Sequence, residues 1–268
     1  MELPSPTWFV GCGNMAGAMI DGWKAARVDM SKAIAIRPSG TPVEGMRTVT
    51  SIKEAGAAPL MMILGFKPQQ LDAVAPELAP WVTSRTVIVS LLAGVEAASL
   101  RRRFSKGTIV RATPNLPVSI RRGVVALHSD QIDEALRKQL SDLFAALGLA
   151  MWTDSEKTLA SIGSVAGAGP AYVARFIDAL ASAGASLGLP DELSATIARE
   201  TVLGTSWMAA SSGEAMDALA SRVASPSGTT EAGLAVLDGE RALEQLIGDT
   251  IEAAAERARS LAEAARLS

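Results

Sequence analysis

Apolar and polar positions follow two different patterns along the chain, and the change falls near its middle. In the first half, short apolar runs predict strands over residues 7–10, 33–36, 60–64, 86–90, 108–111 and 124–127. Between these runs, residues 16–26, 69–79 and 133–147 repeat apolar positions at helical spacing. Strands separated by helices predict right-handed strand–helix–strand units, and therefore a mostly parallel, doubly wound α/β sheet.

No strand pattern follows residues 152–156. Helical spacing begins at residue 171 and returns over residues 191–210, 229–237 and 242–265. We therefore expect two domains, an α/β domain over residues 1–153 and an all-α domain over residues 154–268. Many inward positions of the second domain are Ala or Gly, which supply little volume for a core. Such a domain is expected to bury its surface against a second copy, which predicts at least a homodimer.

Composition excludes several classes of function. The formal net charge of −3 argues against a nucleic-acid partner, which requires a basic face. The single cysteine, Cys12, allows no intrachain disulfide and no Cys-based metal site, and His128 is the single histidine. The start of the chain lacks the pattern of a signal peptide, and no apolar run reaches the roughly 18 residues of a membrane span. We expect a cytoplasmic protein with no membrane partner and no metal, and a structural role for His128.

A glycine-rich turn follows the first predicted strand and opens the first predicted helix. Its sequence is Gly-Cys-Gly-Asn-Met-Ala over residues 11–16, a G-x-G-x-x-A pattern. Such a pattern needs Gly11 for the tight turn, Gly13 for approach of the backbone to a pyrophosphate, and a small residue for close packing of the helix. The alternative is an ordinary glycine turn. The strand–turn–helix context favours a dinucleotide site that includes Asn14 and Met15.

The residues after the second predicted strand indicate which cofactor binds. An NAD site usually has an acidic residue there, which binds the ribose 2′-hydroxyl. Here the strand is followed by Arg37 and then Ser39, which would pair with a 2′-phosphate. A solvated loop arginine is the alternative. The pattern predicts NADP(H), with NADH accepted more weakly.

Five further segments carry a more specific signal. They are residues 64–69 (Leu-Gly-Phe-Lys-Pro-Gln), 90–95 (Ser-Leu-Leu-Ala-Gly-Val), 111–117 (Arg-Ala-Thr-Pro-Asn-Leu-Pro), 167–172 (Gly-Ala-Gly-Pro-Ala-Tyr) and 223–234 (Val-Ala-Ser-Pro-Ser-Gly-Thr-Thr-Glu-Ala-Gly-Leu). In order along the chain, they resemble motifs of the pyrroline-5-carboxylate reductases. The resemblance implies an N-terminal Rossmann domain, a helical dimerisation domain, reduction of 1-pyrroline-5-carboxylate to proline, and dimers that often associate into decamers.

The resemblance also places residues at the cofactor and substrate sites. Lys67 and Pro68, and Ala93 and Gly94, follow strands at the sheet edge where open α/β folds bind ligands. A surface lysine is the alternative for Lys67. Asn115 lies between two prolines and is expected to bind the nicotinamide ribose or amide.

The segment from Ser225 to Thr230 precedes a predicted helix, and its simplest interpretation is a well-capped helix start. With the resemblance, Ser225, Gly228, Thr229 and Thr230 are expected to hold the substrate carboxylate at the helix N-terminus. A threonine hydroxyl is too weak an acid to change charge at neutral pH. We therefore assign Thr230 to orienting the imine nitrogen.

Three residues depart from the family pattern. Thr113 stands where the family usually has Met, Leu116 where it usually has Thr, and Ser227 where it has the first Gly of a Gly-Gly pair. Serine resists positive φ angles, so we expect a shifted loop if that position requires one. These departures leave open a reductase of another imine.

Two other classes share features of this sequence. A β-hydroxyacid dehydrogenase has the same two-domain plan, but it needs a catalytic lysine that residues 163–178 lack. A non-catalytic NADP(H)-sensing regulator would have no need of the loop over residues 225–230.

Overall fold

The computed structural model describes residues 2–267. The chain forms two compact units. The first contains the chain up to Ala168 together with the segment from Ala254 onward, and the second spans Gly169–Ala253. This division falls later than the predicted boundary between residues 153 and 154, and it assigns the end of the last helix to the first unit. The functional division into residues 1–153 and 154–268 stays a prediction.

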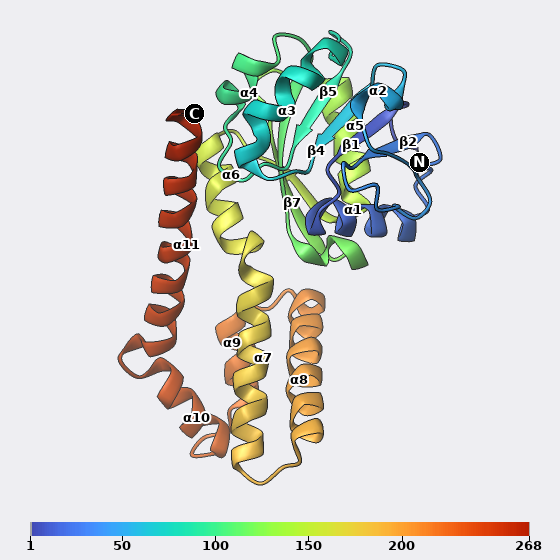
Figure 1. Cartoon of the computed structure of the whole chain (residues 1–268). Coiled ribbons are helices and arrows are strands. Elements are labelled where there is room, and N and C mark those ends of the chain that lie inside the picture. Colours follow the sequence, from blue (N-terminus) through green and yellow to red (C-terminus); the bar gives the residue numbers. More distant parts are fainter. Residues whose placement is uncertain (1, 268) are drawn as a thin grey trace. The chain divides into compact units, whose positions relative to one another are not determined.

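A single sheet forms the centre of the first unit (Figure 1). Its strands are β1 Thr7–Val10, β2 Ala33–Ile36, β3 Arg47–Val49, β4 Met61–Leu64, β5 Val87–Ser90, β6 Thr108–Pro114, β7 Gly123–His128 and β8 Gly148–Trp152. Their order across the sheet is β3-β2-β1-β4-β5-β6-β7-β8. The order steps outward in both directions from β1 and β4, which is the doubly wound topology predicted from the sequence.

Register and burial explain why these runs form strands. Every residue of β1, β2, β4 and β5 is buried, as expected for parallel strands covered on both faces. β1 pairs in parallel with β2 and β4, so the ends of these three strands lie together at one sheet edge. β7 pairs antiparallel with β6. The mostly parallel sheet is thereby confirmed, with one antiparallel pair.

Helices cover both faces of the sheet. The helices of the described chain are α1 Asn14–Ala25, α2 Ile52–Ala55, α3 Leu71–Leu78, α4 Ala97–Arg103, α5 Glu134–Ala145, α6 Glu156–Ile162, α7 Gly169–Ser186, α8 Asp191–Ser212, α9 Met216–Val223, α10 Thr229–Asp238 and α11 Ala242–Leu267. Side chains of α1 and α5 share one buried apolar cluster with the sheet. Side chains of α2, α3 and α4 share the other.

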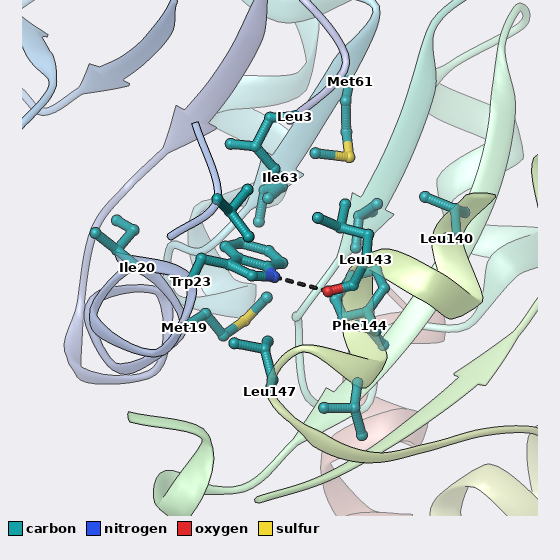
Figure 2. Packing of buried hydrophobic residues seen from close by; sticks show 14 of the residues in the cluster. Leu3, Met19, Ile20, Trp23, Met61, Ile63, Leu140, Leu143, Phe144 and Leu147 are labelled. Atoms are coloured by element: carbon teal, nitrogen blue, oxygen red, sulfur yellow. Dashed lines mark hydrogen bonds between the residues drawn. The ribbon is translucent and has the colours of Figure 1, made fainter. Parts of the chain in front are cut away.

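Trp23 is at the centre of the first cluster (Figure 2). Its ring packs at an angle against Phe144, with the ring centroids 5.6 Å apart. The indole Nε1 donates a 2.9 Å hydrogen bond to the carbonyl of Leu143, so the buried polar atom has a partner. This contact fixes α1, which carries the glycine turn, against α5.

The second unit is entirely helical, which confirms the all-α character predicted for this part of the chain. α7 and α8 approach closely, because a Cβ on Gly184 would lie only 2.3 Å from Ser194 Oγ. Ser194 in turn donates a 2.6 Å hydrogen bond to the carbonyl of Ala181. No residue of α7 is buried, although the helix is rich in apolar residues. None of the helices in the described chain is long and apolar enough to cross a membrane.

Candidate active site

The glycine turn after β1 is built by close approach of two backbones. Gly11 has a φ of +79°, a conformation that favours glycine. A Cβ at Gly11 would lie 3.0 Å from the carbonyl carbon of Gly65, and one at Gly65 would lie 2.7 Å from the carbonyl oxygen of Gly11. The ends of β1 and β4 therefore meet without intervening side chains. This leaves the turn narrow and its backbone accessible, as a pyrophosphate site requires.

The N-terminus of α1 follows directly. The helix begins at Asn14, and its N-cap residue Gly13 provides no side-chain hydrogen bond. The first turn contains no acidic residue. Its unpaired N–H groups and the helix dipole therefore favour an anion at this position. These residues fit the diphosphate of a dinucleotide.

Cys12 lies inside the turn. Burial raises the pKa of its thiol to about 11, and the nearby positive charge of Arg37 opposes this rise. The thiol is therefore neutral near pH 7, because its pKa lies several units higher. Cys12 acts as a small filler of the turn, and a thiolate nucleophile is not expected there.

Arg37 and Ser39 form part of a compact loop at the end of β2. The backbone N–H of Arg37 donates to the carbonyl of Val49 at 2.9 Å, and its Nη1 donates to the carbonyl of Thr41 at 3.0 Å. The hydroxyls of Ser39 and Thr41 are 3.0 Å apart. Arg37 is half-buried and Ser39 exposed. The loop thus holds a guanidinium and a hydroxyl beside the strand end where a 2′-phosphate would lie.

The ends of β4 and β5 carry the next predicted residues. Lys67 is exposed, and its backbone N–H donates to the side chain of Gln70 at 3.2 Å, beside half-buried Pro68. Ala93 is exposed in the loop after β5, and Gly94 has a φ of +75°. A Cβ at Gly94 would lie 3.1 Å from the backbone nitrogen of Ala262 in α11. Because β4 and β5 are parallel neighbours, the loops that follow them, which carry these predicted cofactor residues, lie on the same side of the sheet, at the carboxyl ends of the strands.

The side chain of Asn115, predicted to bind the nicotinamide ribose or amide, hydrogen-bonds within the fold through both of its polar atoms. It is buried, its Oδ1 accepts from the N–H of Val124 at 2.8 Å, and its Nδ2 donates to the carbonyl of Ala166 at 3.0 Å. Ala166 belongs to a π-helical turn over Gly163–Gly167, an irregularity common at functional sites. Contact of Asn115 with the cofactor stays a prediction. The observed bonds hold the end of β6 in place.

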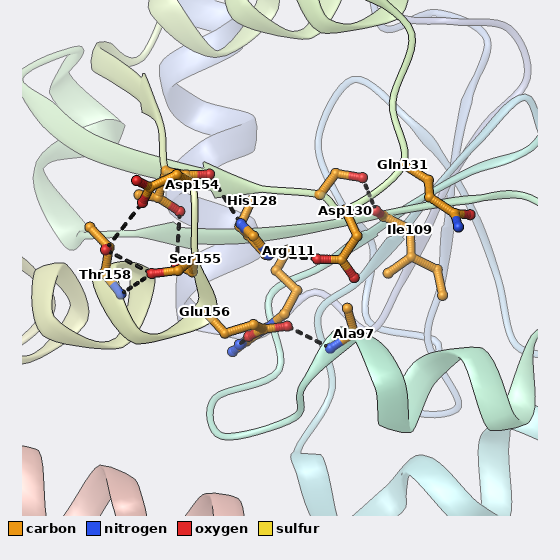
Figure 3. Close-up of polar contacts among 12 residues, drawn as sticks. Ala97, Ile109, Arg111, His128, Asp130, Gln131, Asp154, Ser155, Glu156 and Thr158 are labelled. Carbon is orange, nitrogen blue, oxygen red and sulfur yellow. Dashed lines mark hydrogen bonds and ion pairs between the residues drawn. The ribbon is translucent and has the colours of Figure 1, made fainter.

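The sequence interpretation missed a polar cluster around Glu156, which Figure 3 shows. The carboxylate of Glu156 contacts Arg111 Nη1 and also accepts from the N–H of Ala97 at 2.8 Å. The only signal for it was the presence of Arg111 in one of the family-like segments, because Glu156 lies 45 positions further along.

His128 is buried in the same region. Its Nδ1 lies 3.0 Å from the carbonyl of Thr153, and its Nε2 lies 3.1 Å from a carboxylate oxygen of Asp130. These contacts join the end of β7 to the segment before α6 and fit the structural role expected from the sequence.

The predicted substrate loop belongs to the second unit. Ser227 has a φ of +57°, and its N–H donates to a carboxylate oxygen of Glu231 at 2.6 Å. Gly228 donates from its N–H to the carbonyl of Ser225 at 2.9 Å and serves as N-cap of α10 without a side-chain cap. The serine itself adopts the positive φ that it was expected to resist. The hydrogen bond from the Ser227 N–H to Glu231 stabilises this turn before α10.

The remaining predicted substrate residues lie at the same helix start. Ser225 and Thr229 are exposed, and Thr230 is half-buried in the first turn of α10. A Cβ at Gly228 would lie 2.9 Å from the backbone carbonyl oxygen of Ser225, so the turn has little room for a side chain at this position. The loop thus gathers hydroxyl groups and the uncapped N–H groups of the first turn of α10, which suit a carboxylate ligand, while the acidic Glu231 in the same turn opposes one.

A doubly wound sheet with a G-x-G-x-x-A turn at the end of β1, followed by an all-helical part, is typical of dinucleotide-dependent oxidoreductases. The second part is more specific, because residues 156–261 match the family model described as pyrroline-5-carboxylate reductase dimerisation. The chain is 35% identical to pyrroline-5-carboxylate reductase of Pseudomonas aeruginosa over 95% of this chain and 96% of that protein. It belongs to the pyrroline-5-carboxylate reductase family.

Two solved structures extend this likeness to the fold. The crystal structure of Plasmodium falciparum pyrroline carboxylate reductase with NADP bound matches with a TM-score of 0.87 at 25% identity, covering 96% of this chain and 98% of that chain. The reductase of Coxiella burnetii matches with a TM-score of 0.86 at 29% identity, covering 97% and 99%. The predicted family and fold class are confirmed.

Proposed function

We propose that the protein reduces 1-pyrroline-5-carboxylate to L-proline with a nicotinamide cofactor, the last step of proline biosynthesis. The observation that carries this proposal is identity of 35% to a pyrroline-5-carboxylate reductase over nearly the full length of both chains. The glycine turn, the uncapped start of α1 and the retained loop before α10 support it, since each suits one part of the reaction.

The cofactor is proposed to be NADP(H), with NADH accepted more weakly. The pyrophosphate would lie on the N–H groups after Gly13, and the 2′-phosphate against Arg37 and Ser39. No carboxylate replaces Arg37 at the end of β2, and a carboxylate would repel a 2′-phosphate. Lys67, Pro68, Ala93, Gly94 and Asn115 would surround the rest of the cofactor at the same sheet edge.

When bound, the reduced nicotinamide supplies the hydride that the imine carbon receives. The residues of the chain bind and orient the substrate. Ser225, Gly228 and Thr229 would hold its carboxylate at the start of α10, and the hydroxyl of Thr230 would hydrogen-bond the imine nitrogen. Holding the reacting atoms in a productive arrangement can lower the barrier by several kcal/mol.

The functional unit is a homo-oligomer, as the match to the dimerisation model supports. We propose a homodimer, and a decamer built from dimers stays a prediction, as does a cytoplasmic location. The departures from the family pattern at Thr113, Leu116 and Ser227 support a second candidate function, the reduction of another cyclic imine. Thr113 lies near the end of β6, where a Cβ at Gly163 would lie 3.3 Å from its Cγ2.

The proposal is tested by adding 1-pyrroline-5-carboxylate to the purified protein with NADPH, and with NADH in parallel, while following oxidation of the cofactor by its near-ultraviolet absorbance. We expect rapid oxidation and a lower KM for NADPH than for NADH. Binding of NADPH without turnover would refute the proposed reaction and favour another imine substrate or an NADP(H)-sensing regulator. A lower KM for NADH would refute the cofactor preference alone.

A further inference from the structure

Glu156 joins three segments of the first unit through one carboxylate (Figure 3). Its Oε1 accepts a 2.8 Å hydrogen bond from the N–H of Ala97, the first residue of α4. Its Oε2 contacts Nη1 of Arg111 in β6. Glu156 itself begins α6. The carboxylate thus connects the start of α4, the middle of β6 and the start of α6.

The contact between Glu156 and Arg111 is more shielded from water than an ordinary surface ion pair. The side chain of Arg111 is 11% exposed and that of Glu156 is 28% exposed. Ion pairs removed from water are less screened, and loss of one partner leaves the other charge without compensation. The N-cap residue of α4, Glu96, makes no side-chain cap bond. Glu156 therefore satisfies an N–H group at the start of α4 from a distant part of the chain.

The segment that Glu156 holds is the loop between β5 and α4. At its beginning, the N–H of Leu91 donates to the carbonyl of Leu64 at 3.0 Å, which joins it to the end of β4. At its end, the N–H of Ala97 donates to Glu156. Ala93 and Gly94 lie between these two anchors. The other partner, Arg111, lies in β6, the strand that leads to Asn115.

We propose that Glu156, acting through Arg111 and the N–H of Ala97, is a positioning residue that fixes the β5–α4 loop for cofactor binding. It touches neither cofactor nor substrate. The inference rests on the proposed function, because it assumes that Ala93 and Gly94 contact the nicotinamide cofactor. Its consequence is specific: loss of the carboxylate weakens cofactor binding, while the rate with saturating cofactor changes little.

The test compares Glu156→Ala, Glu156→Gln and the control Asp154→Asn. Glutamine keeps an acceptor for the Ala97 N–H but removes the charge facing Arg111. Asp154 lies two residues before Glu156, and its carboxylate accepts a 3.4 Å hydrogen bond from Thr158 Oγ1. The Asp154→Asn substitution therefore removes a nearby negative charge and leaves the contacts of Glu156 with Ala97 and Arg111 in place. The dissociation constant of NADPH is measured by fluorescence titration, alongside steady-state kinetics and thermal unfolding.

We expect Glu156→Ala to raise both the dissociation constant and the KM of NADPH by about tenfold, which corresponds to about 1.4 kcal/mol of binding free energy. The kcat and the KM for 1-pyrroline-5-carboxylate should stay within about twofold, since the substrate loop lies in the other unit. Glu156→Gln should recover part of the NADPH affinity. Asp154→Asn should match the wild type in all readouts.

Unchanged NADPH affinity in a folded Glu156→Ala, with only a lower unfolding temperature, would overturn the proposal in favour of a purely structural contact. If Glu156→Ala does not fold, the NADPH affinity of Glu156→Gln tests the proposal instead. Wild-type affinity in Glu156→Gln would show that the charge facing Arg111 is not needed, and it would overturn the proposed action through Arg111. The titration does not need turnover. A wild type that binds NADPH but reduces nothing would therefore refute the proposed reaction while still testing Glu156.

Discussion

At the end of β2, the guanidinium of Arg37 is already held by its own loop, through the carbonyl of Thr41. A preorganised arginine loses less side-chain entropy when a phosphate binds, which strengthens discrimination between the two cofactors. The same loop carries Ser39, whose hydroxyl is 3.0 Å from that of Thr41. Under the proposed preference for NADP(H), selectivity at this position would depend on the charge of Arg37 and on the loop that holds it.

Replacing Arg37 by alanine should raise the KM for NADPH about ten- to a hundredfold, the range for losing a charge-assisted hydrogen bond. The KM for NADH should change little, because that cofactor has no 2′-phosphate. Steady-state kinetics with each cofactor checks this. Arg47→Ala is the control, since Arg47 pairs with Ile34 near the opposite end of the strands. Equal effects of Arg37→Ala on both cofactors would exclude a 2′-phosphate contact.

Thr230 is half-buried in the first turn of α10. Thr230→Ala should lower kcat by about one to two orders of magnitude, which is at or below the lower limit of about 10² for groups that transfer a proton, because the hydroxyl only orients the imine nitrogen. Thr230→Ser retains the hydroxyl and should keep most of the activity. Turnover numbers at saturating substrate give the comparison. Wild-type turnover in Thr230→Ala would remove Thr230 from the reaction.

Ser227 pays a conformational cost, because its φ of +57° lies in the left-handed region. Ser227→Gly should raise the free energy of unfolding by about 0.5–1 kcal/mol, since relief of strain exceeds the added freedom of the unfolded chain. Ser221→Gly, inside α9, should lower it by a similar amount. Urea unfolding measures the free energy of unfolding of both variants. A loss of stability in Ser227→Gly would mean that the serine hydroxyl contributes more than the strain costs.

At the scale of single elements, α1 shows how one helix serves both the core and the site. Its first turn presents uncapped N–H groups, while its buried face carries Trp23 and a second glycine, Gly22. A Cβ at Gly22 would lie 2.1 Å from the carbonyl oxygen of Val118 and 2.7 Å from Leu147 Cδ2. The helix thus presses directly on the turn after β6, and its direction relative to the sheet depends on that contact.

Gly22→Ala should lower the free energy of unfolding by about 1–3 kcal/mol, because the added methyl group overlaps backbone that cannot move away. Gly17 lies on the same helix and has no atom within 4 Å of its Cβ position. Gly17→Ala should therefore be neutral or stabilising, by up to about 1 kcal/mol. Chemical denaturation of the two variants compares them. Equal stabilities would show that α1 shifts to accommodate the methyl group.

The elements also show which parts of the fold a sequence can reveal. Buried parallel strands read as continuous apolar runs, so β1 and β2 were predicted with their observed bounds. β3 and β8 lie at the two edges of the sheet, and both were missed. β3 has only three residues and begins with the exposed Arg47, and β8 follows directly on the helix predicted over residues 133–147. The antiparallel pairing of β7 depends on a short connection after Asn115 that leaves no room for a crossover helix.

Parts of the candidate site were likewise predictable from the sequence, and other parts were not. Local motifs, such as the glycine turn and the loop before α10, were visible because their chemistry depends on neighbours in sequence. The contact of Glu156 with Arg111 was not, because it joins residues 45 positions apart. Nor could the sequence show that Asn115 uses both polar ends of its side chain within the fold.

On the scale of the whole molecule, the two units bury their apolar residues very differently. The first has two buried clusters, one on each face of its sheet. In the second, buried apolar side chains are few, and large ones such as Phe176, Leu203 and Leu246 are exposed. A region with so much exposed apolar surface is typical of a permanent interface. The match of residues 156–261 to a dimerisation model agrees with that interpretation.

Phe176 provides the direct test, because 52% of it is exposed on α7, a helix with no buried residue. Phe176→Asp should weaken self-association at least about thirtyfold, as expected when a charge replaces an aromatic anchor worth about 2 kcal/mol. Leu149→Asp on β8 is the control, since Leu149 is 59% exposed but lies outside the matched dimerisation region. Sedimentation velocity over a range of concentrations should show smaller species for Phe176→Asp alone, with helical content retained by circular dichroism. An unchanged oligomer would place the interface on a different face of the helical unit, away from α7.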